Sequence, residues 1–219
     1  MLGAILAPFR GKGYASKLLW TTFVPLMRLL GPLFFDRRYF QGRHFDKSLQ
    51  GWFWVWRSIW WQKVLGFNRA VPWPVSPFIL IANPKTITFD PDDLNNFQTL
   101  GCYFSNAFDS RIVIGKGTYI APNVGLVTAN HNPCDPEEIL PPEDIVLGSK
   151  CWIGMNAVIL PGVSLGDRTV VAAGAVVTKS FSEGNCVIGG VPAKVLKRLD
   201  CGESLSAAAL CRGEPGEEA

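Results

Sequence analysis

The stretch "LGSKCWIGMNAVILPGVSLGDRTVVAAGAVVTKS", residues 147–180, repeats one pattern every six residues. The first position of each block is aliphatic, the second is often Gly or Ala, and the fifth is mostly small. Because side chains alternate sides along a strand, positions one and five face the same way, and that side must be the interior. A fixed short repeat of this kind is typical of a solenoid.

The same period extends toward the N-terminus. The blocks "FDSRIV", "IGKGTY", "IAPNVG" and "LVTANH" occupy residues 108–131, and a weaker copy covers residues 81–92. Three short strands per turn, with glycine at the corners, predict a triangular prism of parallel strands spaced about 4.8 Å apart. The strict period of six disfavours an ordinary β-sandwich, whose turns recur irregularly at roughly 8 to 12 residues.

The phase of the repeat breaks between His131 and Leu147. The segment "NPCDPEEILPPEDIV", residues 132–146, contains four prolines and five acidic residues and cannot continue a parallel ladder. We therefore predict a loop over residues 132–146 that leaves the prism, in a position where long loops frequently carry function. His131, one of two histidines in the chain, occupies the last outward position before this loop.

The N-terminal part, residues 1–74, is basic and aromatic, and we expect it to be mostly helical or irregular. Residues 1–72 carry eleven Lys and Arg against two Asp, and "GWFWVWRSIWW", residues 51–61, holds five of the eight tryptophans. This composition favours contact with a membrane surface over binding to nucleic acid. For the apolar run over residues 18–35, the alternative to membrane-surface attachment is a helical segment that packs on the main domain or on a sister subunit.

The apolar run over residues 18–35 is not expected to span a membrane. It contains Arg28, and a charge at the centre of a spanning helix costs about 3 kcal/mol. The six cysteines include no C-x-x-C pair and are read as reduced thiols of a cytoplasmic protein, which could be peripheral on the inner membrane face. We place the prism at residues 75–190, a short helix at 191–199 and a disordered acidic tail at 200–219.

Three separated motifs, "TANHNPCDP" (128–136), "CWIGMNAVILPGVSLGDRTVVAAGAVVTKSF" (151–181) and "VIGGVPAKVLKRL" (187–199), resemble the hexapeptide-repeat acyltransferases. The likeness covers about residues 78–199 and is greatest to the galactoside, maltose and nodulation-factor O-acetyltransferases and the serine acetyltransferases. The N-terminal residues look more like the exopolysaccharide and capsule branch. The resemblance implies an all-β, left-handed parallel β-helix that forms a homotrimer and binds acetyl-CoA between neighbouring prisms.

The resemblance also implies roles for individual residues. His131 takes the place of the catalytic base, and the expected cofactor-binding residues are Trp152, Ala173, Thr178, Lys179, Lys194 and Lys197. A neutral imidazole suits removal of a hydroxyl proton near neutral pH. Asn130, Asp135 and Glu143 lie near this base in the sequence and are candidates for binding the acceptor.

The sequence therefore predicts an acetyl-CoA-dependent O-acetyltransferase that acts on a sugar hydroxyl in cell-surface polysaccharide or exopolysaccharide biosynthesis. Its acceptor is a sugar or a lipid-linked saccharide, and residues 1–72 hold it at the membrane surface. The alternatives are an N-acetyltransferase acting on an amino-sugar and a non-catalytic scaffold. No metal is expected, because the γ-type carbonic anhydrases of similar fold need three histidines and this chain has only His44 and His131.

Overall fold

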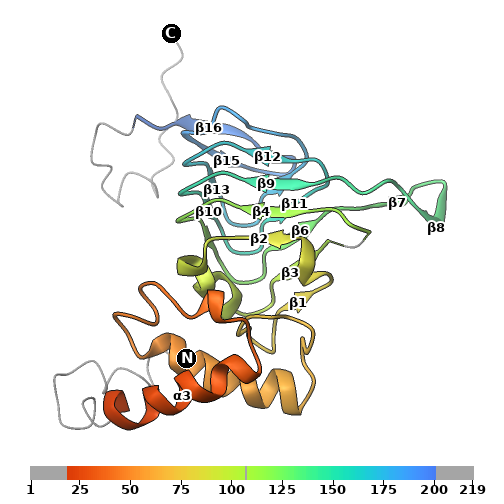
Figure 1. Cartoon of the computed structure of the whole chain (residues 1–219). Coiled ribbons are helices and arrows are strands. Elements are labelled where there is room, and N and C mark those ends of the chain that lie inside the picture. Colours follow the sequence, from red (N-terminus) through yellow and green to blue (C-terminus); the bar gives the residue numbers. More distant parts are fainter. Residues whose placement is uncertain (1–18, 107, 201–219) are drawn as a thin grey trace.

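The computed structural model describes residues 19–106 and 108–200, and most of its strands stack in three parallel sheets (Figure 1). Sheet A has the order β1-β3-β6-β11-β14, sheet B has β2-β4-β9-β12, and sheet C has β5-β10-β13-β15-β16. The bounds in sheet A are Leu80–Ile81, Tyr103–Ser105, Gly125–Val127, Val158–Ile159 and Val176–Val177. Those in sheet B are Ile87–Thr88, Ile112–Ile114, Ile145–Leu147 and Ser164–Leu165, and those in sheet C are Tyr119–Ile120, Trp152–Ile153, Val170–Val171, Cys186–Gly189 and Lys194–Arg198.

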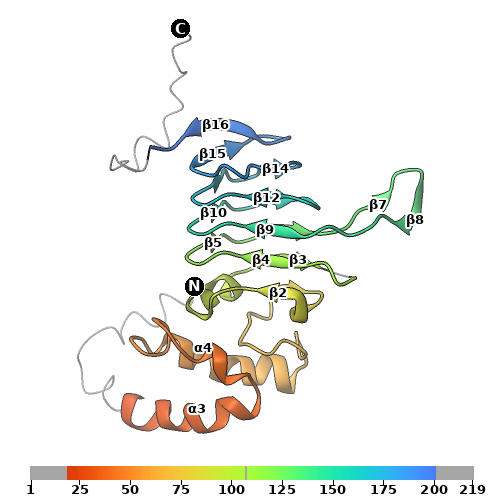
Figure 2. The ribbon, with the colours of Figure 1, turned by 45° about the horizontal axis from the view of Figure 1, so that its top comes forward.

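From β4 to β14, apart from two strands between β6 and β9, successive strands pass from sheet B to sheet C to sheet A, so each of these turns contributes one strand to each of three sides. In the first turn a short helix at residues 91–98 stands in place of the strand in sheet C. Within sheet A the register shows how successive turns stack, since Phe104 in β3 pairs with Leu126 in β6, and Val158 in β11 pairs with Gly125 in β6 and Val176 in β14. The prediction of a three-sided stack of parallel strands is therefore confirmed (Figure 2).

The period of six determines which side chains enter the core. The nine aliphatic first positions are all buried: Ile114, Ile120, Leu126, Leu147, Ile153, Ile159, Leu165, Val171 and Val177. The small fifth positions are buried as well: Thr118, Val124, Cys151, Ala157, Val163, Thr169 and Ala175. These apolar contacts stabilise the prism, because removing aliphatic surface from water contributes about 25 cal/mol per Å².

The prediction is wrong for one block. The repeat predicts that Phe108 occupies an inward first position, but its side chain is exposed and its φ is +58°. The inward residue of this turn in sheet A is Phe104, which pairs with Leu126. The connection from β3 to β4 is longer than a regular corner, so Phe108 lies in this connection outside the core.

The chain leaves the prism after β6 and returns at β9, as the break in the repeat predicted, but the predicted loop over residues 132–146 ends two residues too late. Ile145 and Val146 already belong to β9 and pair in parallel with Ile112 and Val113, because the buried Ile145 provides an inward position of sheet B. Between these strands, β7 (His131–Asn132) and β8 (Asp135–Ile139) form an antiparallel hairpin that projects away from the three sheets (Figures 1 and 2). Every residue of β8 is exposed. We call residues 131–139 the hairpin.

The described N-terminal residues form helices that cover the first turn of the prism (Figure 2). They comprise η2 (Leu19–Phe23), α3 (Val24–Leu30), η3 (Gly31–Leu33), η4 (Arg37–Tyr39), α4 (Gln50–Ser58) and η5 (Ile59–Val64), and the short helices η6 (Pro84–Thr86) and η7 (Pro91–Gln98) follow within the first turn. Tyr39 and Trp73 pack on Phe89, and Phe97 joins Trp73 to Phe104. This aromatic cluster makes one continuous core of the helices and the prism.

The tryptophan-rich segment divides between core and surface. Trp52 and Trp54 are buried, whereas Trp56, Trp60 and Trp61 are exposed. This segment therefore packs on the rest of the chain through only part of its surface. Among the described residues, no helix has the length and apolar composition needed to cross a membrane.

The short helix predicted over residues 191–199 is wrong. Residues 194–198 form β16, which pairs antiparallel with β15 at the end of sheet C. All five of its side chains are exposed, so no buried apolar face favours a helix, whereas the outer edge of β15 offers backbone groups that need partners. The acidic tail predicted at 200–219 lies outside the described residues except for Asp200.

Candidate active site

His131 lies at the start of the hairpin, where the chain leaves sheet A, and its side chain is exposed. Its Nδ1 atom lies 2.6 Å from the carbonyl oxygen of Pro136, across the hairpin. Because a carbonyl oxygen can only accept a hydrogen bond, Nδ1 carries the proton. In the neutral ring the Nε2 lone pair is then available to accept a proton, as a general base requires.

Polar contacts fix the base of the hairpin. Thr128 is buried, and its hydroxyl donates to the carbonyl oxygen of Ser105 at 2.8 Å, while its backbone carbonyl accepts from the Glu143 N–H at 2.8 Å. On the return side, Asp144 accepts hydrogen bonds from the backbone N–H and the guanidinium of Arg111. These contacts, led by the backbone N–H, lower the pKa of Asp144. The ends of the hairpin are therefore anchored to neighbouring turns of the prism.

The three candidate acceptor residues do not form one cluster. Asn130 lies at the base of the hairpin, where its carbonyl accepts from the Leu140 N–H at 2.8 Å. Glu143 lies beside the next corner, since a Cβ atom on Gly162 would meet its carboxylate oxygen at 2.5 Å. Asp135 lies farther out, paired with Asn132 near the turn. Asn130 and Glu143 thus flank the hairpin base, and Asp135 is near the tip.

Two predicted cofactor residues share one row across the outer face of sheet C. Trp152 pairs with Val170, Val170 pairs with Val187, and Val187 pairs with Lys197 of β16. Paired residues point to the same face of a sheet, and both Trp152 and Lys197 are exposed. The row offers an aromatic ring at one end and an ammonium group at the other, about 14 Å apart at three strand spacings. Lys194, also in β16, lies at the end of the same strand.

The remaining cofactor candidates lie elsewhere on the prism. Thr178 and Lys179 follow β14, at the corner where sheet A turns toward sheet B, and the ammonium of Lys179 lies over the Phe181 ring. His131 follows β6 at the corresponding corner two strands earlier. We call this row of corners the A–B edge. Ala173 lies at the corner between sheets C and A.

One chain therefore does not bring its predicted site residues together. In a three-sided prism the edge shared by two sides lies opposite the third side. The A–B edge, with His131 and Lys179, is thus across the prism from the face of sheet C, with Trp152 and Lys197. Within one chain, the two groups of predicted site residues therefore lie on opposite parts of the prism.

A polar network missed in the sequence lies beside the sheet C row. Arg43 donates to the Tyr119 hydroxyl at 2.8 Å and to Asn95 at 3.1 Å, and it pairs with Asp93. Tyr119 is the neighbour of Trp152 in sheet C. The repeat indicates that Tyr119 is an outward aromatic residue one turn before Trp152. Arg43 is distant in the sequence, and nothing near it indicates a contact with Tyr119.

His44 belongs to this network and not to the hairpin site. Its ring packs against Trp54 and contacts Arg43 and Asn95. Burial is the main reason that the pKa of His44 is lowered, with Arg43 adding to the effect. These contacts make His44 part of the packing between the N-terminal helices and the first turn of the prism. Among the described residues, no three His, Cys, Asp or Glu side chains converge as metal ligands would.

Comparison with known proteins identifies the repeat. Residues 144–179 match the family model "Bacterial transferase hexapeptide (six repeats)". The resemblance inferred from the three motifs is thereby confirmed, and this part of the chain is a hexapeptide repeat of the bacterial transferase type.

The chain is similar to several named acetyltransferases. It is 38% identical to the galactoside O-acetyltransferase of Escherichia coli K12 over 96 residues, which cover 42% of this chain and 46% of that protein. It is 32% identical over 128 residues to WcaF of the same strain, provisionally named a colanic acid biosynthesis acetyltransferase, with 56% and 64% covered. The chain spans about half the length of the curated relatives it matches.

Among solved structures, a hexapeptide-repeat-containing acetyltransferase from Vibrio cholerae, complexed with acetyl coenzyme A, is 28% identical to this chain. It aligns with a TM-score of 0.45 over 56% of this chain and 68% of its own.

Proposed function

We propose that this protein is an acetyl-CoA-dependent O-acetyltransferase that acts on a sugar hydroxyl, with the prism coiled in the left-handed sense. The observation that carries the proposal is the position of His131: its exposed imidazole, oriented by Pro136, lies where the hairpin leaves the repeat. The names of the similar proteins, which include O-acetyltransferases, support the class of reaction.

The residues on sheet C fit the proposed co-substrate. Trp152 offers an apolar ring for the pantetheine chain, and Lys194 and Lys197 offer positive charge for the phosphates of CoA. Bound acetyl-CoA would supply the acetyl group as a thioester. Thr178 and Lys179 are proposed to contact the same molecule from the A–B edge of a neighbouring chain.

His131 would move one proton in each direction. Its Nε2 takes the proton of the acceptor hydroxyl as the oxygen forms a bond to the acetyl carbon, and the C–S bond breaks. The imidazolium then returns the proton to the departing sulfur. The Pro136 carbonyl keeps its hydrogen bond to Nδ1 at this stage, so the orientation of the ring is unchanged.

A homotrimer would complete the site. The separation of His131 and Lys179 from Trp152 and Lys197 on opposite parts of the prism is the argument for an active site between chains. Asn130, Asp135 and Glu143 are the proposed acceptor contacts, and cell-surface polysaccharide or exopolysaccharide assembly is the proposed setting. The name of WcaF supports this setting.

Peripheral attachment to the cytoplasmic membrane surface is proposed for the N-terminal helices. Leu26, Leu29 and Leu33 form one exposed apolar stripe, and Trp56, Trp60 and Val64 form another. Both stripes have helical spacing, and the eleven Lys and Arg of residues 1–72 would favour an anionic leaflet.

An assay of thiol release from acetyl-CoA with sugar, amino-sugar and serine acceptors tests the proposed reaction. We expect release with a sugar, and product analysis that places the acetyl group on oxygen. Acetylation of nitrogen would identify an N-acetyltransferase. If no acceptor gave thiol release and acetyl-CoA gave no thermal shift, the non-catalytic scaffold would be supported instead.

A further inference from the structure

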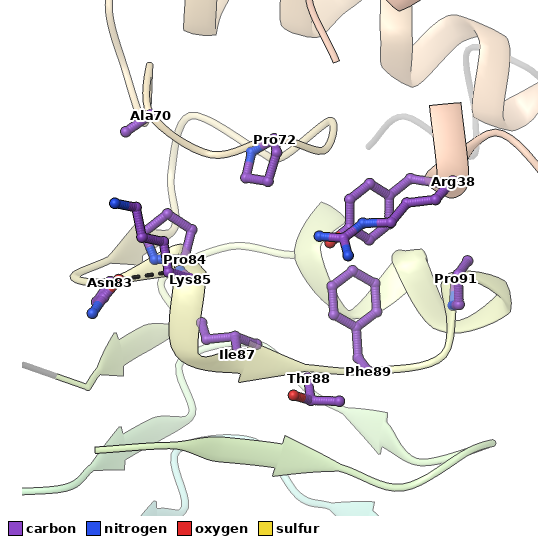
Figure 3. A pocket seen from close by; sticks show the side chains of 11 residues that line it. Arg38, Ala70, Pro72, Asn83, Pro84, Lys85, Ile87, Thr88, Phe89 and Pro91 are labelled. Atoms are coloured by element: carbon purple, nitrogen blue, oxygen red, sulfur yellow. Dashed lines mark hydrogen bonds between the residues drawn. The ribbon is translucent and has the colours of Figure 1, made fainter. Parts of the chain in front are cut away.

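A cavity of about 860 Å³ lies between the N-terminal helices and the first turn of the prism, and none of its lining residues is a predicted site residue (Figure 3). Arg38, Tyr39, Ala70 and Pro72 form one wall, and the opposite wall runs from Asn83 to Pro91. The cavity is therefore formed by the N-terminal helices and the first turn of the prism together, and the proposed reaction gives this junction no other role.

The lining combines positive charge with apolar rings. Arg38 and Lys85 lie on opposite sides of the cavity in Figure 3, with Phe89 and Ile87 on the wall between them. None of the lining residues is acidic. Arg38 pairs through Nε with Asp36 at 3.1 Å, and its planar guanidinium has four further N–H donors. Such a lining favours a ligand that carries a phosphate group together with apolar or ring surface.

The cavity wall is held in place by the neighbouring turn. The carboxamide of Asn106 is buried, accepts from the Asn83 backbone N–H at 3.1 Å and donates to the Thr86 hydroxyl at 2.8 Å. Asn83 in turn accepts from the backbone N–H of Lys85 at 3.1 Å. On the other wall, Tyr39 stacks on Phe89 with ring centroids 5.4 Å apart. The geometry of the cavity is thus determined by packed side chains.

The cavity also lies on the same side of the prism as His131. Residues 83–86 connect β1 to β2, so they form the first corner of the A–B edge, and the hairpin leaves the same edge two turns later. Two strand spacings correspond to about 10 Å along the stack. The connection between them carries Phe108, an exposed aromatic residue with φ of +58°. A sugar attached to a group in the cavity could therefore extend past Phe108 toward the hairpin.

We propose that this cavity binds the phosphate of a phosphorylated sugar acceptor, with Arg38 and Lys85 as its charged contacts. The inference rests on the proposed function and names the chemical class of its acceptor. A sugar phosphate ester can come from two sources, a lipid-linked diphosphate sugar or a soluble nucleotide sugar, and both present the same charged group.

The test is direct binding, measured by calorimetry without acetyl-CoA. The probes are galactose, galactose 1-phosphate, UDP-galactose and a short-chain polyprenyl diphosphate galactose in detergent. We expect at least about tenfold tighter binding of the phosphorylated sugars than of galactose, as for the gain of a charge-assisted hydrogen bond. Stronger binding of the polyprenyl probe than of UDP-galactose would identify the lipid-linked source, and the reverse order the soluble one.

Variants distinguish binding by the charged residues of the cavity from an effect of the overall charge of the protein. Lys85→Gln and Arg38→Gln should each weaken binding of the phosphorylated probes several-fold, and Lys85→Glu should weaken it further. Lys150→Gln, a matched change of an exposed lysine elsewhere on the prism, should leave binding unchanged. Because Arg38 also packs over Tyr39, the Lys85 variants provide the test that is independent of this packing.

Equal binding of galactose and its phosphate, no binding of any phosphorylated probe, or unchanged binding by the Lys85 variants would overturn the inference. Thiol release without phosphate-selective binding would contradict this inference alone. Phosphate-selective binding in a protein that released no thiol with any acceptor would contradict the proposed reaction alone.

Discussion

The Nδ1 atom of His131 donates a hydrogen bond to the Pro136 carbonyl oxygen, 2.6 Å away across the hairpin. This contact holds the ring by a backbone group and not by a carboxylate. Since backbone carbonyls do not titrate, the orientation of the imidazole does not depend on the protonation of a neighbouring side chain. The hydrogen bond keeps the proton of the neutral ring on Nδ1, and Nε2 is the nitrogen that can accept a proton.

Loss of positive charge on β16 should weaken binding of acetyl-CoA. We expect Lys197→Gln to raise the KM for acetyl-CoA by about tenfold with little change in kcat. The reason is that one charge-assisted contact is lost equally in the ground state and in the transition state. Steady-state kinetics with varied acetyl-CoA measures this effect. Lys150→Gln is the matched control and should behave as wild type. An unchanged KM in Lys197→Gln would argue against the sheet C row as the cofactor path.

Acid should destabilise the fold through His44. The pKa of His44 is lowered by burial, so the unfolded chain binds a proton more readily than the folded chain. Its neutral form therefore contributes stability above pH about 6.5, and this contribution is lost as the pH falls from 6.5 through the folded-state pKa. Thermal unfolding between pH 5 and 7.5 should show a smaller decrease in His44→Gln than in wild type. Identical pH profiles would contradict this account.

The inward positions of the repeat should dominate stability. Ile153 is fully buried in β10, and Ile153→Ala should lower the free energy of unfolding by about 2 to 5 kcal/mol, through lost apolar burial and the cavity that remains. Val146→Ala, at an outward position of sheet B, is the matched control and should cost much less. Urea denaturation measures both. Similar losses at the two positions would contradict the assignment of inside and outside.

Membrane attachment should depend on the exposed helical stripes. Replacing Leu29 and Trp60 by Ser should reduce sedimentation with anionic liposomes at low salt several-fold, because both side chains are exposed and neither is part of the core. Val146→Ser removes an exposed apolar side chain from the prism and should not change sedimentation. If wild type failed to sediment with the liposomes, attachment by this segment would be wrong.

Much of the fold could be predicted because a period of six encodes the side of each strand directly. Leu165 and Thr169 needed only their place in a block to be assigned to the interior, and both are buried. The period of six does not apply to Phe108, because the connection around it is longer than one regular corner. The strand at 194–198 could not be predicted, because Val195, Leu196 and Leu199 suit a helix or a strand equally in so short a segment. The open edge of β15 decided between the two.

The candidate site was predicted residue by residue, but its arrangement was not. The sequence placed His131 beside a loop, yet the contact with Pro136 depends on the hairpin register, which short strands with few apolar residues specify weakly. The row from Trp152 to Lys197 was hidden by the incorrect helix. The Arg43–Tyr119 contact joins residues 76 positions apart, and nothing local in either segment indicates it.

The most direct test of the central claim is the rate of thiol release by wild type and His131→Gln with acetyl-CoA and a sugar acceptor. Because His131 is exposed, the substitution should leave thermal unfolding unchanged. We predict that kcat falls by about 10² to 10⁴, as for loss of a general base, while the KM for acetyl-CoA changes little. Turnover by His131→Gln at the wild-type rate would contradict the role of His131.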